Sequence, residues 1–396
     1  MGALMGKIRL SPPDEAILHK VLESELSNLE MLELLKLEPR LLSEDDRKFL
    51  MDLEKQIDSQ VEKQPVRSGG VHSAQRRIGK RRFIGARQTT IAGEVEISGT
   101  GLHSGAPVSV VLHPAPADTG LCFIVSKRGR IISQIEADIR AVRGKQLHAV
   151  LGDDRGVTVE TVEHLLSALR GLSVDNCFIE IDNREVPIMD GSAAIFVDAI
   201  SKVWVRELAA PRKFIKVLKP VRVQDGKFWS ELNPHSGFHM DVEIDFDEPA
   251  IGRQRLALDV SPGSYRRELA RARTFGFLGD FERLLKAGFA LGASLANSVA
   301  IDGKGKICNP DGLRFPNEFV RYKIMNAIGW LALAGAPILG QYRSFGSTGA
   351  NKAKLLEAFF ADSENWAVVH APREVDHPNV EAFPVLTTGR YLPNRA

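Results

Sequence analysis

One stretch of the 396-residue sequence places side chains with useful chemistry at a regular spacing. Within residues 317–331, Tyr322, Asn326 and Trp330 recur at every fourth position, which puts them on one side of a helix. A His and an Asp at the first two of these positions would direct two zinc ligands the same way. This chain has a phenol and an amide there instead.

A helix is needed to present these side chains, and the apolar residues of the stretch predict one. Val320, Ile324 and Ile328 recur at helical spacing and indicate an amphipathic helix. A second helix is predicted over residues 161–169, closed by Gly171. It carries an adjacent carboxylate and imidazole near its N-terminus, where the helix dipole disfavours an imidazolium and suits a neutral ligand.

The rest of the chain from residue 89 onward alternates predicted strands and helices, which is typical of an α+β protein. Alternating residues, as in Met240, Val242 and Ile244, indicate half-buried strands. A short linker is expected over residues 207–212, between two α+β units of similar size. The predicted strands are Val108 to Leu112, Cys177 to Ile181, Phe214 to Leu218 and Met240 to Phe246.

The composition is that of an ordinary globular protein, with 44% hydrophobic and 26% charged residues. A net charge of +2 argues for neither a nucleic acid nor a membrane surface as partner. The three cysteines form no CxxC pair, which indicates a reducing compartment and no cysteine-based metal site. No apolar run approaches the roughly 20 residues of a membrane span, and the N-terminus has no basic-then-apolar signal pattern, so a cytoplasmic location is expected.

The N-terminal region differs in texture from the rest of the chain. Residues 1–62 predict a helical arm of two amphipathic helices, and residues 63–87 form a basic linker. The arm either packs on the main body as an α-hairpin or serves as a docking or dimerisation element. The linker is interpreted as solvated chain, because it lacks the interleaved aromatic residues that nucleic-acid binding would use.

Several motifs occur together in a specific order. They are Gly99-Thr-Gly-Leu-His-Ser-Gly105, Thr161-Val-Glu-His-Leu-Leu-Ser-Ala168, Val186-Pro-Ile-Met-Asp-Gly-Ser-Ala193, Ala272-Arg-Thr-Phe-Gly-Phe277, Asn309-Pro-Asp-Gly-Leu-Arg-Phe315 and Asn317-Glu-Phe-Val-Arg-Tyr-Lys-Ile324. Over about residues 87–370 they resemble the UDP-3-O-acyl-N-acetylglucosamine deacetylase family, LpxC, which performs the committed step of lipid A biosynthesis.

The resemblance implies two LpxC-like domains, over residues 88–208 and 213–390. Each would be a β-sheet with helices packed on one face, and the helices would be sandwiched between the domains. The active site would lie in the cleft between them, with a hydrophobic tunnel for an acyl chain. Phe275, Phe277 and the segment 291–315 would line that region.

The resemblance also implies zinc-dependent amide hydrolysis, with zinc held by two His and one Asp. Carried over position by position, the first zinc ligand falls on His164 and the catalytic base on Glu163. The threonine and lysine that stabilise the oxyanion fall on Thr274 and Lys323. All four residues are present.

Other positions of the implied reaction centre depart from the family pattern. Tyr322 replaces the second zinc ligand, Asn326 replaces the third, and Trp330 stands where a further Asp is usual. Gly349 occupies the position of the acid His. An amide is a poor zinc donor, and a tyrosine would have to lose a proton with a pKa near 10.

These departures predict an LpxC-like pseudoenzyme, a non-catalytic binding or regulatory protein linked to lipid A (lipopolysaccharide) biosynthesis. In this interpretation no cofactor is expected. His164 would be a lone remnant of the metal site, and Glu163, Thr274 and Lys323 would be vestigial. The alternative is an active zinc-dependent deacetylase with an altered metal site.

The expected partner is another protein of the lipid A pathway, with the active deacetylase as one candidate, held through the arm of residues 1–62. A UDP-sugar lipid precursor is a second candidate ligand, and neither a nucleic acid nor a membrane span is expected. His103 and Asp190 are interpreted as structural. His235 and His239 are four apart on a predicted turn and strand, which does not align them on a helix, so no metal role is expected.

Overall fold

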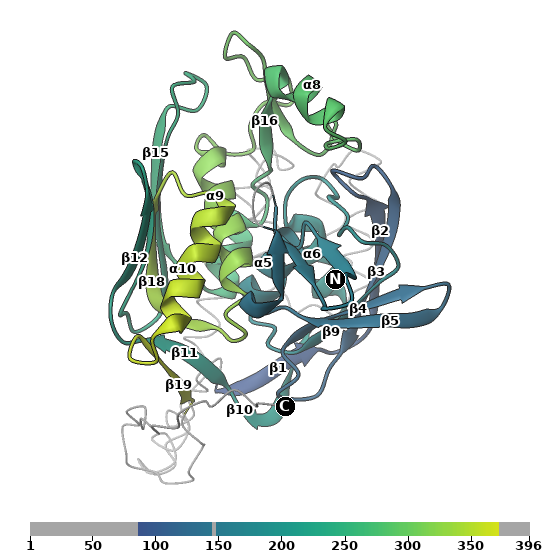
Figure 1. Ribbon diagram of the computed structural model, residues 1–396, viewed down its shortest axis with the longest axis vertical. Coiled ribbons are helices and arrows are strands. Elements are labelled where there is room, and N and C mark those ends of the chain that lie inside the picture. Colours follow the sequence, from purple (N-terminus) through teal and green to yellow (C-terminus); the bar gives the residue numbers. More distant parts are fainter. Residues whose placement is uncertain (1–85, 145–147, 372–396) are drawn as a thin grey trace, which may run out of the picture. The chain divides into compact units, whose positions relative to one another are not determined.

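The computed structural model describes residues 86–144 and 148–371 (Figure 1). The predicted arm of residues 1–62 lies outside the described residues, as does nearly all of the basic linker 63–87. The described part combines several sheets with helices, so the prediction of an α+β fold is confirmed. No helix in this part is long and apolar enough to cross a membrane.

The first large sheet has five strands in the order β2-β3-β9-β4-β5. Its pairs are antiparallel except β4 and β9, which run parallel. Val108, Val110 and Leu112 alternate with more exposed residues and point into the core. The strands are β2 (Val95–Thr100), β3 (Pro107–Pro114), β4 (Leu121–Lys127), β5 (Arg130–Glu136) and β9 (Cys177–Ile181).

The second large sheet has seven strands and is centred on β18, which pairs with β13 on one side and with β11 and β14 by parallel bridges. Met240, Val242 and Ile244 of β14 face the core, as their alternation predicts. The strands are β11 (Lys213–Val217), β12 (Val221–Asp225), β13 (Phe228–Asn233), β14 (Phe238–Asp245), β15 (Arg253–Asp259), β18 (Ile338–Phe345) and β19 (Trp366–His370).

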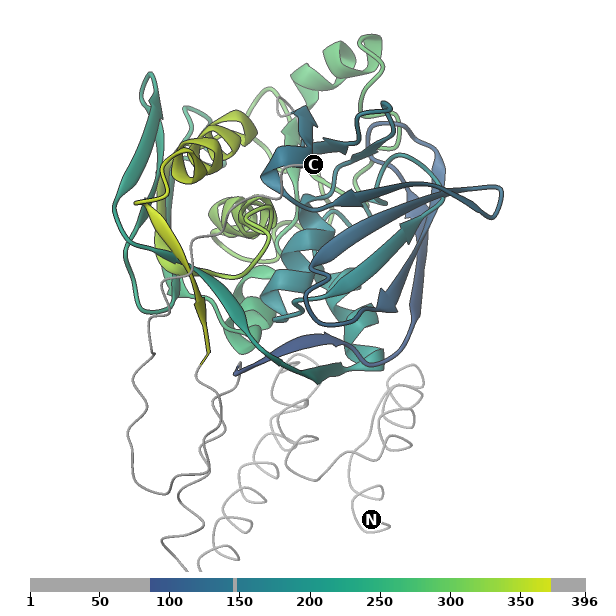
Figure 2. The ribbon, with the colours of Figure 1, turned by 60° about the horizontal axis from the view of Figure 1, so that its bottom comes forward.

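The main helices lie between these two sheets (Figure 2). They are α5 (Glu163–Gly171), α6 (Ala194–Val203), α9 (Glu318–Leu331) and α10 (Gly349–Ala361). Helix α6 packs on β2, α9 on β14 and β15, and α10 on β12 and β13. The sandwiched arrangement that the resemblance implies is therefore confirmed.

Helices α5 and α9 approach each other closely at Gly329. A Cβ atom at this position would lie 2.1 Å from the backbone oxygen of Glu163, so only glycine permits the contact. The close approach brings the N-terminus of α5 against the last turn of α9. The two stretches with candidate chemistry are thus neighbours.

The predicted linker over residues 207–212 is wrong, because most of it belongs to strand β10 (Val205–Pro211). This strand pairs antiparallel with β1 (Arg87–Ile91). The partner strand lies more than a hundred residues earlier, so no local pattern reveals the pairing. The domain limits of 88–208 and 213–390 remain predictions.

Smaller elements surround the helices. A three-stranded sheet leads into α5, and the parallel pair β16 and β17 carries α8 beyond the end of α9 (Figure 1). These elements are β6 (Val142–Gly144), β7 (Val150–Gly152), β8 (Thr158–Glu160), β16 (Phe275–Phe277), β17 (Val299–Ile301), α7 (Pro262–Ser264), α8 (Leu278–Lys286), the 3₁₀ turn Ile139–Ala141 and the π-helical turn Tyr265–Leu269.

Candidate active site

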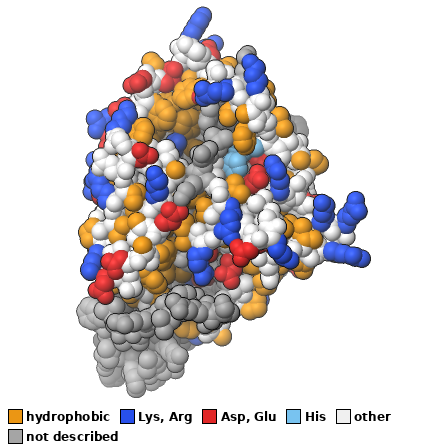
Figure 3. All heavy atoms as spheres, in the orientation of Figure 1, with side chains coloured by type: hydrophobic (Ala, Val, Ile, Leu, Met, Phe, Trp, Pro, Cys, Tyr) orange, Lys and Arg blue, Asp and Glu red, His pale blue; other side chains and the backbone are white. Residues whose placement is uncertain are grey.

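A cavity of about 520 Å³ lies where α5, α9, β16 and α8 meet. Its walls are mostly apolar, and hydrophobic side chains also gather on the upper part of this face of the molecule (Figure 3). Both predicted substrate-binding residues, Phe275 and Phe277, line it. The polar side chains at its wall include Glu163, His164, Thr274, Tyr322 and Asn326.

Glu163 is the first residue of α5 and is only 4% exposed. Thr161 precedes it in the left-handed region, with φ of 57°, and turns the chain from β8 into the helix. Glu163 Oε1 accepts a hydrogen bond from the Ala149 amide at 2.8 Å. Burial raises the pKa of the Glu163 carboxyl, against the opposing effects of nearby N–H groups, His148 and Lys352. The carboxyl group is therefore held in place and suited to exchanging a proton.

His164 follows on the same helix and is also 4% exposed. Burial lowers its pKa to about 4, and Asp190 opposes this shift only weakly. Its Nδ1 atom is buried and has no hydrogen-bond partner among the described residues. The imidazole is therefore neutral at pH 7 and has a lone pair available for a ligand.

Helix α9 supplies the opposite wall through Tyr322 and Asn326. The Tyr322 ring meets the His164 ring edge-on, with 5.7 Å between the ring centroids. Burial raises the pKa of Tyr322 to about 12, although hydrogen bonds with Thr274 and Asn326 oppose the rise. At pH 7 roughly one phenol in 10⁵ is ionised. Trp330, the third residue of the predicted stripe, is 1% exposed and lies in the core beyond the cavity.

Lys323 does not line the cavity. It is half-buried, and its Nζ lies 5.4 Å from the centroid of the Phe275 ring, a residue that does line the cavity. Burial lowers the pKa of the Lys323 ammonium. The lysine thus contacts a residue of the cavity wall without lining the cavity itself.

Gly349 begins α10, and Thr348 caps this helix by accepting a hydrogen bond from the Asn351 amide at 3.2 Å. One turn further, Lys352 is 3% exposed. Burial, with help from the charge of Lys323, lowers the pKa of Lys352 to about 7, and Glu163 opposes the shift. No motif in the sequence predicted that this lysine is buried. Its spacing from the buried Leu355, Leu356 and Phe359 was the available signal.

Two further histidines line the cavity, and only His103 stands out in the sequence. The rings of His103 and His148 stack with 4.5 Å between centroids and an interplanar angle of 23°. His148 Nε2 lies 3.6 Å from the Glu160 carboxylate. Burial, followed by the neighbouring His148, lowers the pKa of His103. The two rings add polar groups to the cavity wall. The sequence predicted a structural role for His103 and no role for His148.

Asp190 takes the structural role that the sequence predicts. Its Oδ1 accepts hydrogen bonds from the Ser192 amide and hydroxyl at 3.1 and 2.8 Å. Its Oδ2 lies 2.8 Å from Arg314 Nη1. The pKa of Asp190 is lowered because these hydrogen bonds outweigh the effect of burial.

Comparison with known proteins identifies the family. Residues 88–361 match the family model described as LpxC, UDP-3-O-acyl N-acetylglycosamine deacetylase. The chain belongs to the LpxC family.

Individual relatives agree with this assignment. A UDP-3-O-acyl-N-acetylglucosamine deacetylase of Brucella melitensis is 43% identical over 290 residues, covering 73% of this chain and 100% of the relative. Deacetylases with the same description from Pseudoalteromonas atlantica and Shewanella piezotolerans are 42% and 41% identical, covering 76% and 74% of this chain and 99% and 95% of their own lengths.

Two predictions are corrected by this finding. The expectation that the chain is not an enzyme is wrong, because these LpxC relatives, at 41–43% identity over nearly their whole lengths, are named as deacetylases. The expectation of no cofactor is wrong for the same reason, since the resemblance to this family implies zinc. The substituted side chains are few, whereas the match to the family extends over residues 88–361.

The residues at the implied LpxC zinc position nevertheless do not match a three-ligand catalytic zinc site. His164 offers a neutral imidazole, but Tyr322 presents a protonated phenol and Asn326 an amide. Catalytic zinc sites use three donors drawn from His, Glu, Asp and Cys. We therefore assign no catalytic step to a metal held by these three residues.

Proposed function

We propose that this chain is a deacetylase that acts on UDP-3-O-acyl-N-acetylglucosamine in lipid A biosynthesis, through a reaction centre altered from the family pattern. The relatives named as deacetylases support the reaction and the substrate class. The observation that carries the proposal is that Glu163 and His164 stand together at the wall of a cavity in the matched region.

The form of the cavity supports an acylated substrate. Phe275, Phe277 and Leu284 line it, and leucines such as Leu278 and Leu295 reach the surface beside them. Each CH₂ group of an acyl chain buried there contributes about 0.8 kcal/mol. The apolar part would hold the acyl chain while the polar wall meets the acetamido group.

The side chains of this wall can supply proton transfer and hydrogen bonds to the reacting amide. Glu163 takes a proton from the attacking water and gives a proton to the sugar nitrogen as the C–N bond breaks, which leaves acetate and an amine. The Thr274 hydroxyl, the Tyr322 phenol and the Asn326 amide are donors that can stabilise the oxyanion. Such a donor contributes about 10²–10³-fold in rate.

The test is direct product analysis. The purified full chain is incubated with UDP-3-O-acyl-N-acetylglucosamine, and the free amine product is measured by mass spectrometry. The control is Glu163→Gln, which keeps the side chain's size and its acceptor for the Ala149 amide. We expect product from the wild type and at least about a hundredfold less from the variant. Product no greater than that of the variant contradicts the proposal.

A cytoplasmic location and a protein partner also belong to this proposal. Cys122, Cys177 and Cys308 are free thiols, which suits a reducing compartment. Residues 1–62 lie outside the family match of 88–361, so they are available for a separate task. We propose that they bind another protein of the lipid A pathway.

A further inference from the structure

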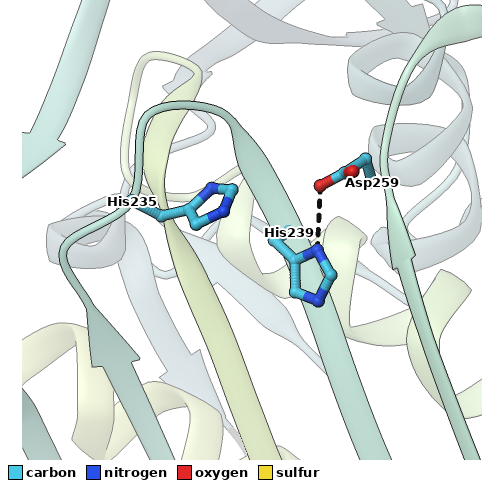
Figure 4. Close-up of side chains that lie close together, drawn as sticks. All are labelled: His235, His239 and Asp259. Atoms are coloured by element: carbon cyan, nitrogen blue, oxygen red, sulfur yellow. Dashed lines mark hydrogen bonds and ion pairs between the residues drawn. The ribbon is translucent and has the colours of Figure 1, made fainter.

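A second group of polar side chains lies on strands β14 and β15 and in the turn before β14, and none of its members lines the cavity. It consists of His235, His239 and Asp259 (Figure 4). One ligand atom from each residue lies within 4.8 Å of the others. Sequence spacing alone predicts no metal role for the two histidines, because the third residue comes from the following strand.

The sheet fixes the relative positions of these three residues. His239 and Asp259 are direct cross-strand partners in the antiparallel pair β14 and β15. His235 lies in the turn before β14, and its ring centroid is 5.4 Å from that of His239. The carbonyl of Asp259 accepts a hydrogen bond from Ser264 at 2.7 Å, which anchors the end of β15. Two of the three residues are therefore held by regular strand backbone, and the third lies in the short turn that leads into β14.

The cluster ends a row of charged pairs on the outer face of the sheet. Along this row Asp241 pairs with Arg255 and Arg343, at 2.8 and 3.3 Å. Asp259 instead meets an imidazole, with 2.8 Å between its Oδ1 and His239 Nδ1. An arginine offers a carboxylate only hydrogen-bond donors, whereas an imidazole nitrogen can itself become a metal ligand beside the carboxylate.

We propose that His235, His239 and Asp259 bind one divalent transition-metal ion of the Zn²⁺ class. Two imidazoles and one carboxylate are donors that zinc uses in three-ligand sites, with water completing the tetrahedron. Bonds of about 2.0–2.1 Å place neighbouring donors about 3.3 Å apart. His239 Nδ1 and Asp259 Oδ1 are 2.8 Å apart and need to separate by about half an ångström, and because all three ligand atoms lie within 4.8 Å of one another, shifts of at most about 1.5 Å bring His235 to the same spacing. Mg²⁺ and Ca²⁺ prefer oxygen ligands, so two imidazole nitrogens make this site a poor one for them.

Metal binding has a specific consequence at His235. Its Nδ1 now accepts the amide hydrogen of Gly237 at 3.1 Å. If Nδ1 binds the metal, its lone pair is no longer available to this amide. If Nε2 binds the metal, the ring proton moves to Nδ1, and the acceptor is again lost. In both cases the Gly237 amide is released, so its resonance reports on the site.

The experiment is a Zn²⁺ titration of the chelator-treated full chain, followed by calorimetry and by the ¹⁵N-glycine amide spectrum. We expect one binding event that moves the Gly237 resonance. His239→Ala and His235→Ala should each weaken this event more than about tenfold. Mg²⁺ at the same concentrations should leave the Gly237 resonance in place.

Two matched variants separate this site from other histidines. His113→Ala removes a histidine whose two ring nitrogens each meet a carboxylate, Glu94 and Glu180, and it should leave the event unchanged. His164→Ala should also leave it unchanged, which separates it from any ion bound in the cavity. An unmoved Gly237 resonance in the wild type, or undiminished binding in His239→Ala, overturns the proposal.

Discussion

The two walls of the cavity differ in how far they follow the LpxC pattern. The α5 wall keeps Glu163 and His164, a buried carboxyl beside a neutral imidazole. The opposite wall, from α9, carries Tyr322 and Asn326 where the resemblance implies a His and an Asp. Gly349, at the start of α10, stands where it implies a further His. One wall of a site can therefore change its chemistry while the packing that forms the cavity persists.

The substituted residues of the α9 wall have interaction partners of their own. Tyr322 hydrogen-bonds with both Asn326 and Thr274, so its phenol is not buried without partners. Lys352 on α10 is buried, and burial, followed by the charge of Lys323, lowers its pKa to about 7 against the effect of Glu163. The phenol of Tyr322 and the amide of Asn326 thus stand where the resemblance implies zinc ligands. The ammonium group of Lys352, whose pKa is lowered, lies on the helix that would carry the acid His.

The largest expected effect comes from restoring the altered wall. Tyr322→His, Asn326→Asp and Gly349→His together should raise zinc affinity by at least about a hundredfold, because α9 already presents positions 322 and 326 one turn apart. Calorimetric zinc titration measures the gain. Tyr322→Phe is the control, since it removes the hydroxyl without adding a donor. An unchanged affinity in the triple variant would show that the backbone does not direct these positions to a common point.

A smaller effect is expected from Lys352→Met. The folded-state pKa of about 7 lies below the ordinary value of 10.5, so the unfolded chain binds the extra proton between these pH values. Wild-type stability from this group therefore rises as pH rises from about 7 to 10.5. The variant should be more stable than the wild type at pH 6, by a few kcal/mol, and the gain should shrink towards pH 10.

Urea unfolding at pH 6 and pH 10 measures this difference. Lys354→Met is the matched control, because Lys354 lies on the same helix but is exposed. An equal gain from both variants, or a gain that does not depend on pH, would remove the argument that a buried charge is the cause.

His164→Gln tests the α5 wall through acid stability. The pKa of about 4 in the fold lies below the ordinary 6.5, so the unfolded chain takes up a proton first as the pH falls. The wild type should lose on the order of 3 kcal/mol between pH 6.5 and 4 through this group, and the variant should not. Thermal unfolding across this range measures the loss. His113→Gln, a partly exposed histidine on the first sheet, should retain the wild-type slope.

Deleting residues 1–62 should have the smallest effect on the activity and stability of the cavity region, because these residues lie outside the family match. Deacetylation and the unfolding midpoint should stay near wild-type values, whereas co-purification with a tagged lipid A pathway enzyme should be lost. Undiminished co-purification of the truncated chain would assign the interaction to the remaining residues.

Local patterns in the sequence predict much of the fold. The helix over 317–331 and the strand around Met240 are found where the apolar spacing indicates, because burial of one face determines both. Strand β10 is missed because its partner β1 is remote in the sequence. The hydrogen bonds that define this strand are long-range, and no local spacing encodes them.

The site shows the same division. Glu163, His164 and Thr274 are predicted from motifs and line the cavity. Lys352 and His148 are missed because their roles depend on which face of a helix or loop meets a distant element. The prediction that the chain is not an enzyme is wrong for another reason. It depended on a few substituted positions, whereas the match to the family extends over residues 88–361.

The most direct test of the central claim, that the α5 wall hydrolyses the acetamido group, follows the acetyl carbon in H₂¹⁸O. The account predicts that the wild type releases acetate carrying one ¹⁸O atom from UDP-3-O-acyl-N-acetylglucosamine. It also predicts that Glu163→Gln releases at least about a hundredfold less. Labelled acetate from the wild type at no more than the level of Glu163→Gln would contradict it.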